Sequence, residues 1–176
     1  MARPFLADAE FVNKAAANQA HLINTCIACN QACLDHVFQQ KRASCLVNPR
    51  ACYETELNFE TAATKKKIAV VGAGPAGLAF SVYAASRGHD VTLFDRAAEI
   101  GGQFNYAKQI PGKEEFHQTL RYFAEMLKVN KVNVQLNSEQ TAESLSSGGY
   151  DHVVLSSGIK ARQLDIPGFN HPKVLS

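Results

Sequence analysis

Hydrophobic and polar positions follow different patterns in the two parts of the chain. Residues 8–20 are rich in alanine and place apolar side chains at helical spacing, which predicts a short helix with Asp8 as its N-cap. Residues 24–57 have no sustained period, and an Asn-Pro dipeptide within them is a turn signal. Residues 58–67 are polar and end in three lysines, a composition typical of a solvated linker.

After this linker, apolar runs alternate with helical patterns. Residues 68–71 form a continuous apolar run followed by glycines, as expected of a buried parallel strand. Residues 75–87 predict a helix with proline in its first turn and a glycine just past its end. The alternation continues with a strand at 91–94, a helix at 113–128 and strands at 132–136 and 153–156. This order predicts an α/β, Rossmann-like fold built on a parallel sheet.

Composition narrows the class of protein. The 176 residues are 46% hydrophobic and 19% charged, and 18 Lys+Arg against 16 Asp+Glu leave a formal charge of +2. These values favour a globular protein over a disordered one and argue against binding nucleic acid through bulk charge. Arg3, Asp8, Glu10 and Lys14 stand where a signal peptide has its apolar core, and no apolar run approaches the length of about 18 residues that a membrane helix needs. We therefore expect a cytoplasmic protein without nucleic-acid or membrane partners.

Four of the five cysteines lie within twenty residues, at the spacing Cys-x2-Cys-x3-Cys-x11-Cys. In a reducing compartment such a group suggests a metal site. Zinc sites favour two paired knuckles, whereas three close cysteines with a remote fourth are the commoner way to wrap a 4Fe-4S cluster. The spacing favours iron–sulfur and leaves zinc as the alternative. The candidate ligands are Cys26, Cys29, Cys33 and Cys45, while Cys52 falls outside the spacing and is interpreted as structural.

The sequence Gly72-Ala73-Gly74-Pro75-Ala76-Gly77 matches Gly-x-Gly-x-x-Gly between a predicted strand and a predicted helix. Gly72 permits the tight turn, Gly74 lets the backbone approach a pyrophosphate, and Gly77 lets the helix pack close to the strand. The helix N-terminus adds amides and the positive end of its dipole. Asp95 ends the second strand, where its carboxylate accepts hydrogen bonds from a ribose. These features predict a dinucleotide site, and a glycine-rich turn without ligand is the alternative.

Segments further along favour FAD over NAD. Gly101, Gly102 and Gln103 follow the second strand, where FAD-binding members of this fold bring small residues and an amide against the pyrophosphate and the flavin. The strand that ends near Gly158 resembles the exit from the FAD half in flavoproteins with two dinucleotide domains, although a strand ending in a simple turn explains it too. Two weaker candidates complete the set. Lys113 would neutralise phosphate at a helix start, and the backbone of Gln140 lies where such proteins pair with adenine.

Taken in order, these motifs resemble the bacterial NADPH-dependent 2,4-dienoyl-CoA reductases. The resemblance covers nearly the whole chain and is carried by residues 23–33, 45–52, 70–77 and 99–104. It extends to Arg3-Pro4-Phe5-Leu6, which is similar to the segment that ends the FMN barrel of that family. The wider group includes trimethylamine dehydrogenase-like and enoate reductase-like enzymes with the same cysteine spacing.

The resemblance implies a chain of cofactors. NADPH reduces FAD, a 4Fe-4S cluster passes electrons singly to FMN, and FMN delivers hydride to the conjugated double bonds of a fatty acyl-CoA. It also implies that the four clustered cysteines are the cluster ligands and that Ala76, Asp95 and Gln103 contact FAD. No residue of this chain is expected to act as a catalytic acid or base.

The FMN barrel and the NADPH domain of that family have no counterpart in these 176 residues. We therefore interpret the chain as the central fragment of a larger enzyme, with those two domains of the same polypeptide as its partners. The expected organisation is a helical arm at 1–23, an iron–sulfur segment at 24–57, a linker at 58–67 and a partial FAD-binding domain at 68–176. Ala161 replaces a proline that is usual in the family, which affects local turn geometry.

Two other functions remain open from the sequence. One is a stand-alone electron-transfer module that holds a cluster and a nucleotide without turning over a substrate. The other is a zinc-stabilised interaction domain with a vestigial nucleotide fold. The six histidines show no ligand spacing and favour neither alternative.

Overall fold

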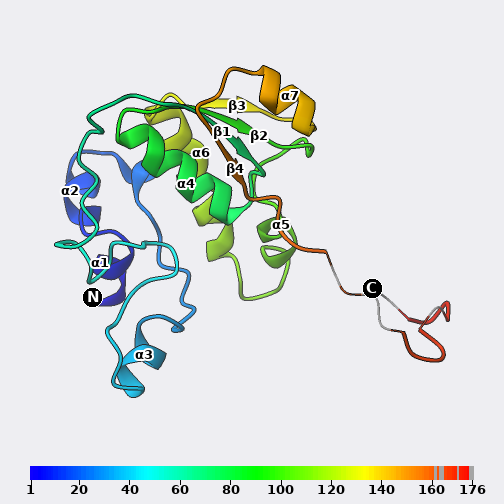
Figure 1. Cartoon of the computed structure of the whole chain (residues 1–176). Helices are drawn as coiled ribbons and strands as arrows, with labels where there is room; N and C mark the ends of the chain where they lie inside the picture. The colour runs from blue at the N-terminus through cyan, green and yellow to red at the C-terminus, as the bar shows by residue number, and fades with distance from the viewer. Residues whose placement is uncertain (161, 163–164, 170, 175–176) are drawn as a thin grey trace.

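The computed structural model describes residues 1–160, 162, 165–169 and 171–174, so Ala161 lies outside the described residues. Its centre is a parallel sheet in the order β3-β2-β1-β4 (Figure 1). The central strand β1 pairs Val70 with Leu93 of β2 on one side and with Val154 of β4 on the other. A strand with neighbours on both sides and helices over its faces has no polar surroundings, which explains its continuous apolar run. The strands are β1 (Lys67–Val71), β2 (Asp90–Phe94), β3 (Asn133–Gln135) and β4 (His152–Leu155).

Two long helices pack with this sheet. Helix α4 (Pro75–Ser86) begins directly after the glycine loop, and α6 (Glu115–Val129) packs against α4. Leu78 of α4, Leu93 of β2 and Phe123 of α6 belong to one buried core. These elements confirm the predicted α/β fold, because each predicted strand and long helix is present within a few residues of its expected bounds.

The apolar face predicted for α6 is divided between two environments. Phe123 and Leu127 are buried in the core under the sheet, and Leu120 packs against the same core. Phe116, one turn nearer the helix start, packs instead against a second cluster made by Ala7, Ile27 and Val47. These three belong to residues 1–60, the cysteine-bearing part of the fold. One helix face therefore serves both parts of the fold.

Two short helices were not predicted. Helix α5 (Phe104–Ala107) follows the second pair of glycines, and α7 (Ala142–Ser147) precedes β4. Thr141 is the N-cap of α7, where its hydroxyl accepts from Ser144 N at 3.2 Å and its own N–H donates to Ser144 Oγ at 3.0 Å. This reciprocal pair is a capping box with Ser144 in the place of the usual Glu or Gln, so the common sequence signature is absent.

The first 60 residues form short helices joined by loops. They are α1 (Arg3–Ala7), α2 (Phe11–Ala16), the 3-10 turn η1 (Ala20–Leu22) and α3 (Leu34–Phe38). The prediction of one helix capped by Asp8 was wrong: α2 starts later, with Glu10 at its N-cap, and Asp8 ends α1. Asp8 is buried, and its charge is compensated there because the carboxylate accepts from Lys14 Nζ at 2.6 Å and from Asn24 N at 2.9 Å.

Side chains from both parts hold the two parts together. Arg121 of α6 donates to the carbonyls of His21 and Ile23, the latter at 2.8 Å. Phe59, within the predicted linker, stacks on Tyr83 of α4 with ring centroids 4.5 Å apart. The cysteine-bearing part is therefore packed onto α4 and α6, and the segment that joins it to the sheet contributes to that packing.

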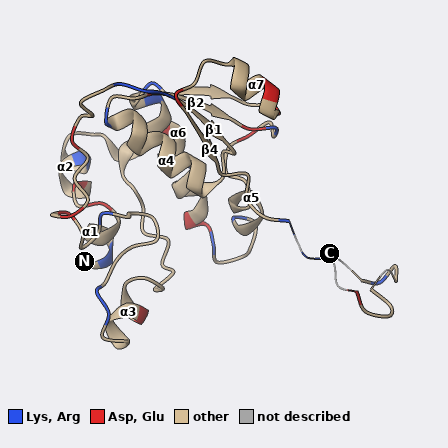
Figure 2. Ribbon diagram, in the orientation of Figure 1, with Lys and Arg blue, Asp and Glu red and all other residues tan. Residues whose placement is uncertain are grey.

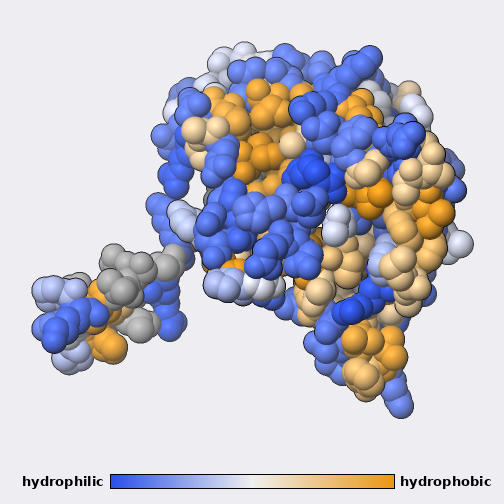
Figure 3. All heavy atoms as spheres, turned by 180° about the vertical axis from the view of Figure 1, so that it is seen from behind, coloured by the Kyte–Doolittle hydropathy of each residue, from blue (hydrophilic) through white to orange (hydrophobic). Residues whose placement is uncertain are grey.

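The surface is mixed in charge and apolar at one tip. Acidic and basic residues occur on both parts of the fold (Figure 2). Helix α3 projects from the body and exposes Val37 and Phe38, and apolar side chains gather at that tip (Figure 3). Among the described residues, no helix combines the length and apolar character needed to cross a bilayer.

Candidate functional site

The glycine loop between β1 and α4 has no room for side chains at two of its positions. Gly72 has φ +111°, and a Cβ placed there would lie 2.3 Å from the carbonyl oxygen of Ser156. A Cβ at Gly77 would lie 1.9 Å from the carbonyl oxygen of Gly72. Ser156 Oγ donates to this Gly72 oxygen at 2.9 Å. Both glycines are thus required by close packing among β1, α4 and the end of β4.

Gly74 has a different environment. Nothing lies within 4 Å of a Cβ placed on it, although the backbone of Gly102 approaches from the opposite side. A Cβ on Gly102 would lie 3.0 Å from Gly74 Cα, and Gly101 N donates to Ala73 O at 2.8 Å. The second glycine turn therefore packs on the first and leaves open space beside Gly74, at the N-terminus of α4, where a pyrophosphate is favoured.

Asp95, directly after β2, fixes the backbone of the glycine loop through hydrogen bonds. Its Oδ2 accepts from Ala73 N at 2.6 Å, and its Oδ1 accepts from Ala97 N at 2.8 Å. Asp95 also lines a cavity of about 300 Å³ at the carboxyl ends of the strands. A crevice in this position is where ligands of open α/β sheets bind, and its volume is at the lower end of the range for small-molecule sites.

Three other predicted site residues line the same cavity, namely Gly72, Gln140 and Gly158. The Gln140 side chain is engaged by Ser138 Oγ and Ser144 Oγ, both at 2.9 Å. Among the described residues, its backbone N–H and C=O have no hydrogen-bond partner. They are thus available to a ligand such as an adenine edge.

The cavity does not include every predicted residue. Gln103 is exposed at the N-cap of α5, and Lys113 precedes α6 with its ammonium 5.7 Å from the centre of the Phe116 ring. Pro75 and Ala76 form the first turn of α4 beside the open space at Gly74. The sequence reasoning missed two basic residues that do line the cavity, Arg96 and Lys160. Their positions just beyond two strand ends were the available signal.

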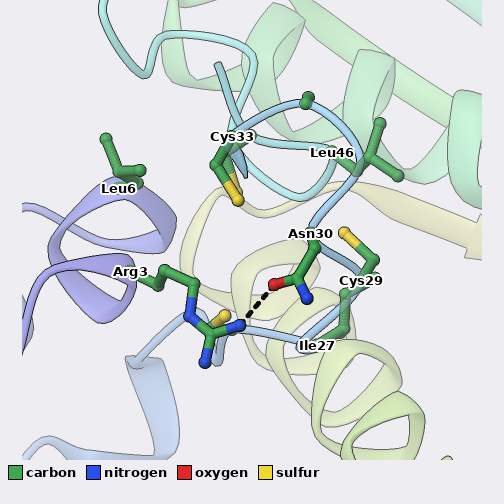
Figure 4. Close-up of a pocket in the computed structure, with 10 residues that line it drawn as sticks. Arg3, Leu6, Ile27, Cys29, Asn30, Cys33 and Leu46 are labelled. Atoms are coloured by element: carbon green, nitrogen blue, oxygen red, sulfur yellow. Dashed lines mark hydrogen bonds between the residues drawn. The ribbon is translucent and has the colours of Figure 1, made fainter. Parts of the chain in front are cut away.

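The four clustered cysteines line one hollow in the first part of the chain (Figure 4). Ala28 and Asn30 have positive φ values of 53° and 59°, so the backbone curls between the first three cysteines. The segment that brings the fourth is tied back by Ser44 N, which donates to Ala32 O at 2.7 Å. The hollow's other walls include Arg3 and Leu6 of α1.

The chemistry of these thiols bears on the metal that they could hold. Four cysteine thiols around one hollow form a set of soft donors. Such a set suits either a single zinc ion, with each sulfur at about 2.3 Å from it, or a 4Fe-4S cluster, in which each thiolate binds one iron. Among the described residues, no group of three or more His, Cys, Asp or Glu side chains converges on a point where a single metal ion would bind.

Burial distinguishes Cys45 from Cys52. Burial raises the pKa of the Cys45 thiol, and the nearby Cys26 and Cys29 thiols act in the same direction, whereas backbone N–H groups of Val47 and Asn48 oppose them. Binding to iron would stabilise the thiolate that burial disfavours. Cys52 is exposed and is not part of the hollow's lining.

A glycine loop at the end of a parallel sheet, beside a crevice of this kind, defines a dinucleotide-binding module of an oxidoreductase. Residues 66–176 match the pyridine nucleotide-disulphide oxidoreductase family, and the chain belongs to that family. The membership confirms the Rossmann-like fold and implies a flavin cofactor.

The likeness to known proteins extends over most of the chain. The chain is 40% identical over 162 residues to a metal reductase from Desulforamulus reducens, which covers 90% of this chain and 24% of that protein. A solved 2-naphthoyl-CoA reductase superposes with a TM-score of 0.93 at 35% identity and covers 97% of this chain and 26% of the other. Histamine dehydrogenase from Rhizobium sp. 4-9 gives 0.83 at 28% identity, with 93% and 24% covered. The chain thus spans about a quarter of the length of these relatives.

Proposed function

We propose that this chain carries the FAD to 4Fe-4S electron relay of an NADPH-dependent 2,4-dienoyl-CoA reductase. One observation supports it most directly: four thiols around one hollow and a glycine loop beside a ligand-sized cavity occur in one packed unit. FAD supplies two-electron chemistry and a 4Fe-4S cluster supplies one-electron chemistry, so the pair converts one into the other. The proposed partners are an FMN barrel and an NADPH domain of the same longer polypeptide.

The nucleotide end of the chain is suited to hold FAD. The open space at Gly74 and the first-turn amides of α4 would receive the pyrophosphate. Asp95 fixes the loop through Ala73 N and would offer its remaining lone pairs to a ribose. The negative charge of Asp95 would repel the 2′-phosphate of NADP, which favours FAD over NADP at this site.

The cysteine end would hold the cluster by enclosing it. Cys26, Cys29, Cys33 and Cys45 would each bind one iron, while Ile27 and Leu6 exclude water from the hollow. Exclusion of water protects the cluster and tunes its potential. Arg3 lies in the same wall as a permanent positive charge, which partly balances an anionic cluster.

The substrate depends on the rest of the enzyme. The similar proteins are named for a metal, an aryl-CoA and an amine, so this module serves different substrates. We propose a fatty acyl-CoA because the sequence motifs resemble the dienoyl-CoA reductases over nearly the whole chain, and a cytoplasmic location because a group of clustered cysteines suits a reducing compartment. An amine-oxidising enzyme that uses the same relay is the second candidate, and the likeness to histamine dehydrogenase favours it.

Anaerobic reconstitution of the chain with iron, sulfide and FAD tests the relay. The expected product is brown, with broad absorbance near 400 nm and about four irons per chain, and acid extraction releases FAD. A colourless chain that takes up zinc and no iron would overturn the proposal. The substrate is tested with the longer enzyme, which should oxidise NADPH on addition of a 2,4-dienoyl-CoA. Reduction by an amine in its place would establish the second candidate.

A further inference from the structure

Two stacked aromatic rings lie between the nucleotide loop and the cysteine hollow. Phe104 opens α5 directly after the second glycine turn, and Phe116 lies in the first turn of α6. Their ring centroids are 4.8 Å apart and their planes are inclined by 18°. Such stacked pairs stabilise by about 0.5 to 1.5 kcal/mol beyond the area that they bury. The pair therefore fixes α5 against α6.

The Phe116 end of the pair reaches the cysteines. Phe116 packs against the buried cluster of Ala7, Ile27 and Val47, and Cys26, Cys29 and Cys45 pack against the same cluster. Ile27 stands within the cysteine loop, and Val47 lies two residues after the fourth cysteine. A change in the order of these cysteines therefore changes the packing around the Phe116 ring.

The Phe104 end reaches the glycine loop. Phe104 N donates to Gly101 O at 3.0 Å, and Gly101 N donates to Ala73 O at 2.8 Å. The next residue, Gly102, lies against Gly74, beside the open space at the N-terminus of α4. Helix α5 has only four residues, so its position depends on the stack with Phe116 and on this contact with the loop. A continuous row of contacts therefore joins the two sites.

We propose that the Phe104–Phe116 pair couples the two sites, so that filling either one raises the affinity of the other. The inference rests on the proposed function, because it needs a cluster at one end and FAD at the other. A filled cysteine hollow fixes Phe116, and through Phe104 it orders the glycine turn before FAD binds. Binding of FAD then costs less conformational entropy, because the glycine turn is already ordered. Linkage makes the effect equal in the reverse direction.

The test compares FAD affinity in iron-loaded and iron-free chain, measured anaerobically by quenching of flavin fluorescence. The wild-type chain should bind FAD about fivefold or more tightly when iron is present, which is the usual scale of coupling between sites. In Phe104→Leu and in Phe116→Leu the ratio should fall to about one, because leucine keeps an apolar side chain but removes the stack. Iron content and circular dichroism verify that the variants load and fold.

A matched control removes a different stack. Phe59 and Tyr83 have centroids 4.5 Å apart and also join the two parts of the fold, but neither belongs to the glycine turn or to α5. Phe59→Leu should therefore keep the wild-type ratio. If Phe116→Leu does not fold, Phe104→Leu decides the question, because Phe104 is half-buried and lies in neither buried cluster of the described residues.

The outcomes separate this inference from the proposed function. A wild-type chain that binds no iron, or no FAD, overturns the proposed function. A wild-type chain that binds both, with the same FAD affinity in either state, overturns the coupling alone. The coupling is also overturned if both phenylalanine variants fold and keep the wild-type ratio, or if Phe59→Leu abolishes the ratio as completely as they do.

Discussion

The side-chain amide of Asn24 donates a 2.7 Å hydrogen bond to the carbonyl oxygen of Val47. Asn24 stands two residues before the first clustered cysteine and Val47 two residues after the fourth. One side chain therefore closes the loop that carries all four thiols. Asp8 fixes the backbone of the same residue, because its carboxylate accepts from Asn24 N at 2.9 Å.

Replacement of this amide should open the cysteine loop. Asn24→Ala leaves the buried Val47 carbonyl without a partner, which costs about 1 to 3 kcal/mol of unfolding free energy. Urea denaturation followed by circular dichroism under reducing conditions measures it, and iron retention should fall in parallel. Asn13→Ala, which removes an exposed bond to Glu10, is the control and should change stability by less than about 0.5 kcal/mol. Equal losses in the two variants would contradict the role of Asn24.

Two glycines of the nucleotide loop should respond differently to alanine. Gly77→Ala places a methyl group 1.9 Å from Gly72 O, between packed backbones, and should destabilise the fold by more than about 4 kcal/mol. Gly74 has φ −75°, and its Cβ would meet nothing within 4 Å. Gly74→Ala should therefore keep thermal stability and weaken FAD binding by about tenfold or more, or about 1.4 kcal/mol. A Gly74→Ala chain that unfolds, or binds FAD normally, would refute this division.

Cysteine variants should separate the four candidate ligands from the fifth cysteine. Cys45→Ser removes a half-buried thiol from the hollow, and the reconstituted chain should lose most of its iron and its absorbance near 400 nm. Cys52→Ser changes an exposed thiol outside the hollow and should retain both. Iron analysis of the two proteins, prepared side by side, is sufficient. Iron loss in Cys52→Ser with full loading in Cys45→Ser would place the site elsewhere.

Tyr122 should make the fold sensitive to alkali. Burial raises the pKa of its phenol, and the neighbouring Tyr83 and Asp8 act in the same direction. In the unfolded chain the Tyr122 phenol ionises near pH 10, while in the folded chain it stays neutral. The contribution to the free energy of unfolding is therefore full below that pH and falls above it by up to about 1.4 kcal/mol per pH unit. Tyr122→Phe should flatten this fall in denaturation midpoints between pH 9 and 11, a range set about the normal phenol pKa. The exposed Tyr106→Phe should leave it unchanged, and an unaltered slope in Tyr122→Phe would disprove the prediction.

The sequence was most informative where one short segment carries the whole signal. The run before Gly72 predicted β1 because a strand buried on both faces needs apolar residues at every position. The glycine spacing predicted the loop because Gly72 and Gly77 each answer a local steric demand, while Gly74 leaves open space at the N-terminus of α4. Asp8 shows the opposite case. Its pattern is that of an N-cap, but its Oδ2 accepts from Lys14 and Asn24, and its Oδ1 accepts from Glu10 N, so it ends α1 and joins three segments.

The sequence by itself determined the parallel α/β fold, the position of the glycine loop and the grouping of four cysteines, because hydrophobic period, glycine spacing and cysteine spacing act over a few residues. Only the tertiary structure decided that Phe116 faces the cysteines while Phe123 faces the sheet, and that Arg96 and Lys160 join the cavity with Asp95. These residues are far apart in the sequence. The packing of whole helices and strands brings them together, and no local sequence pattern indicates that packing.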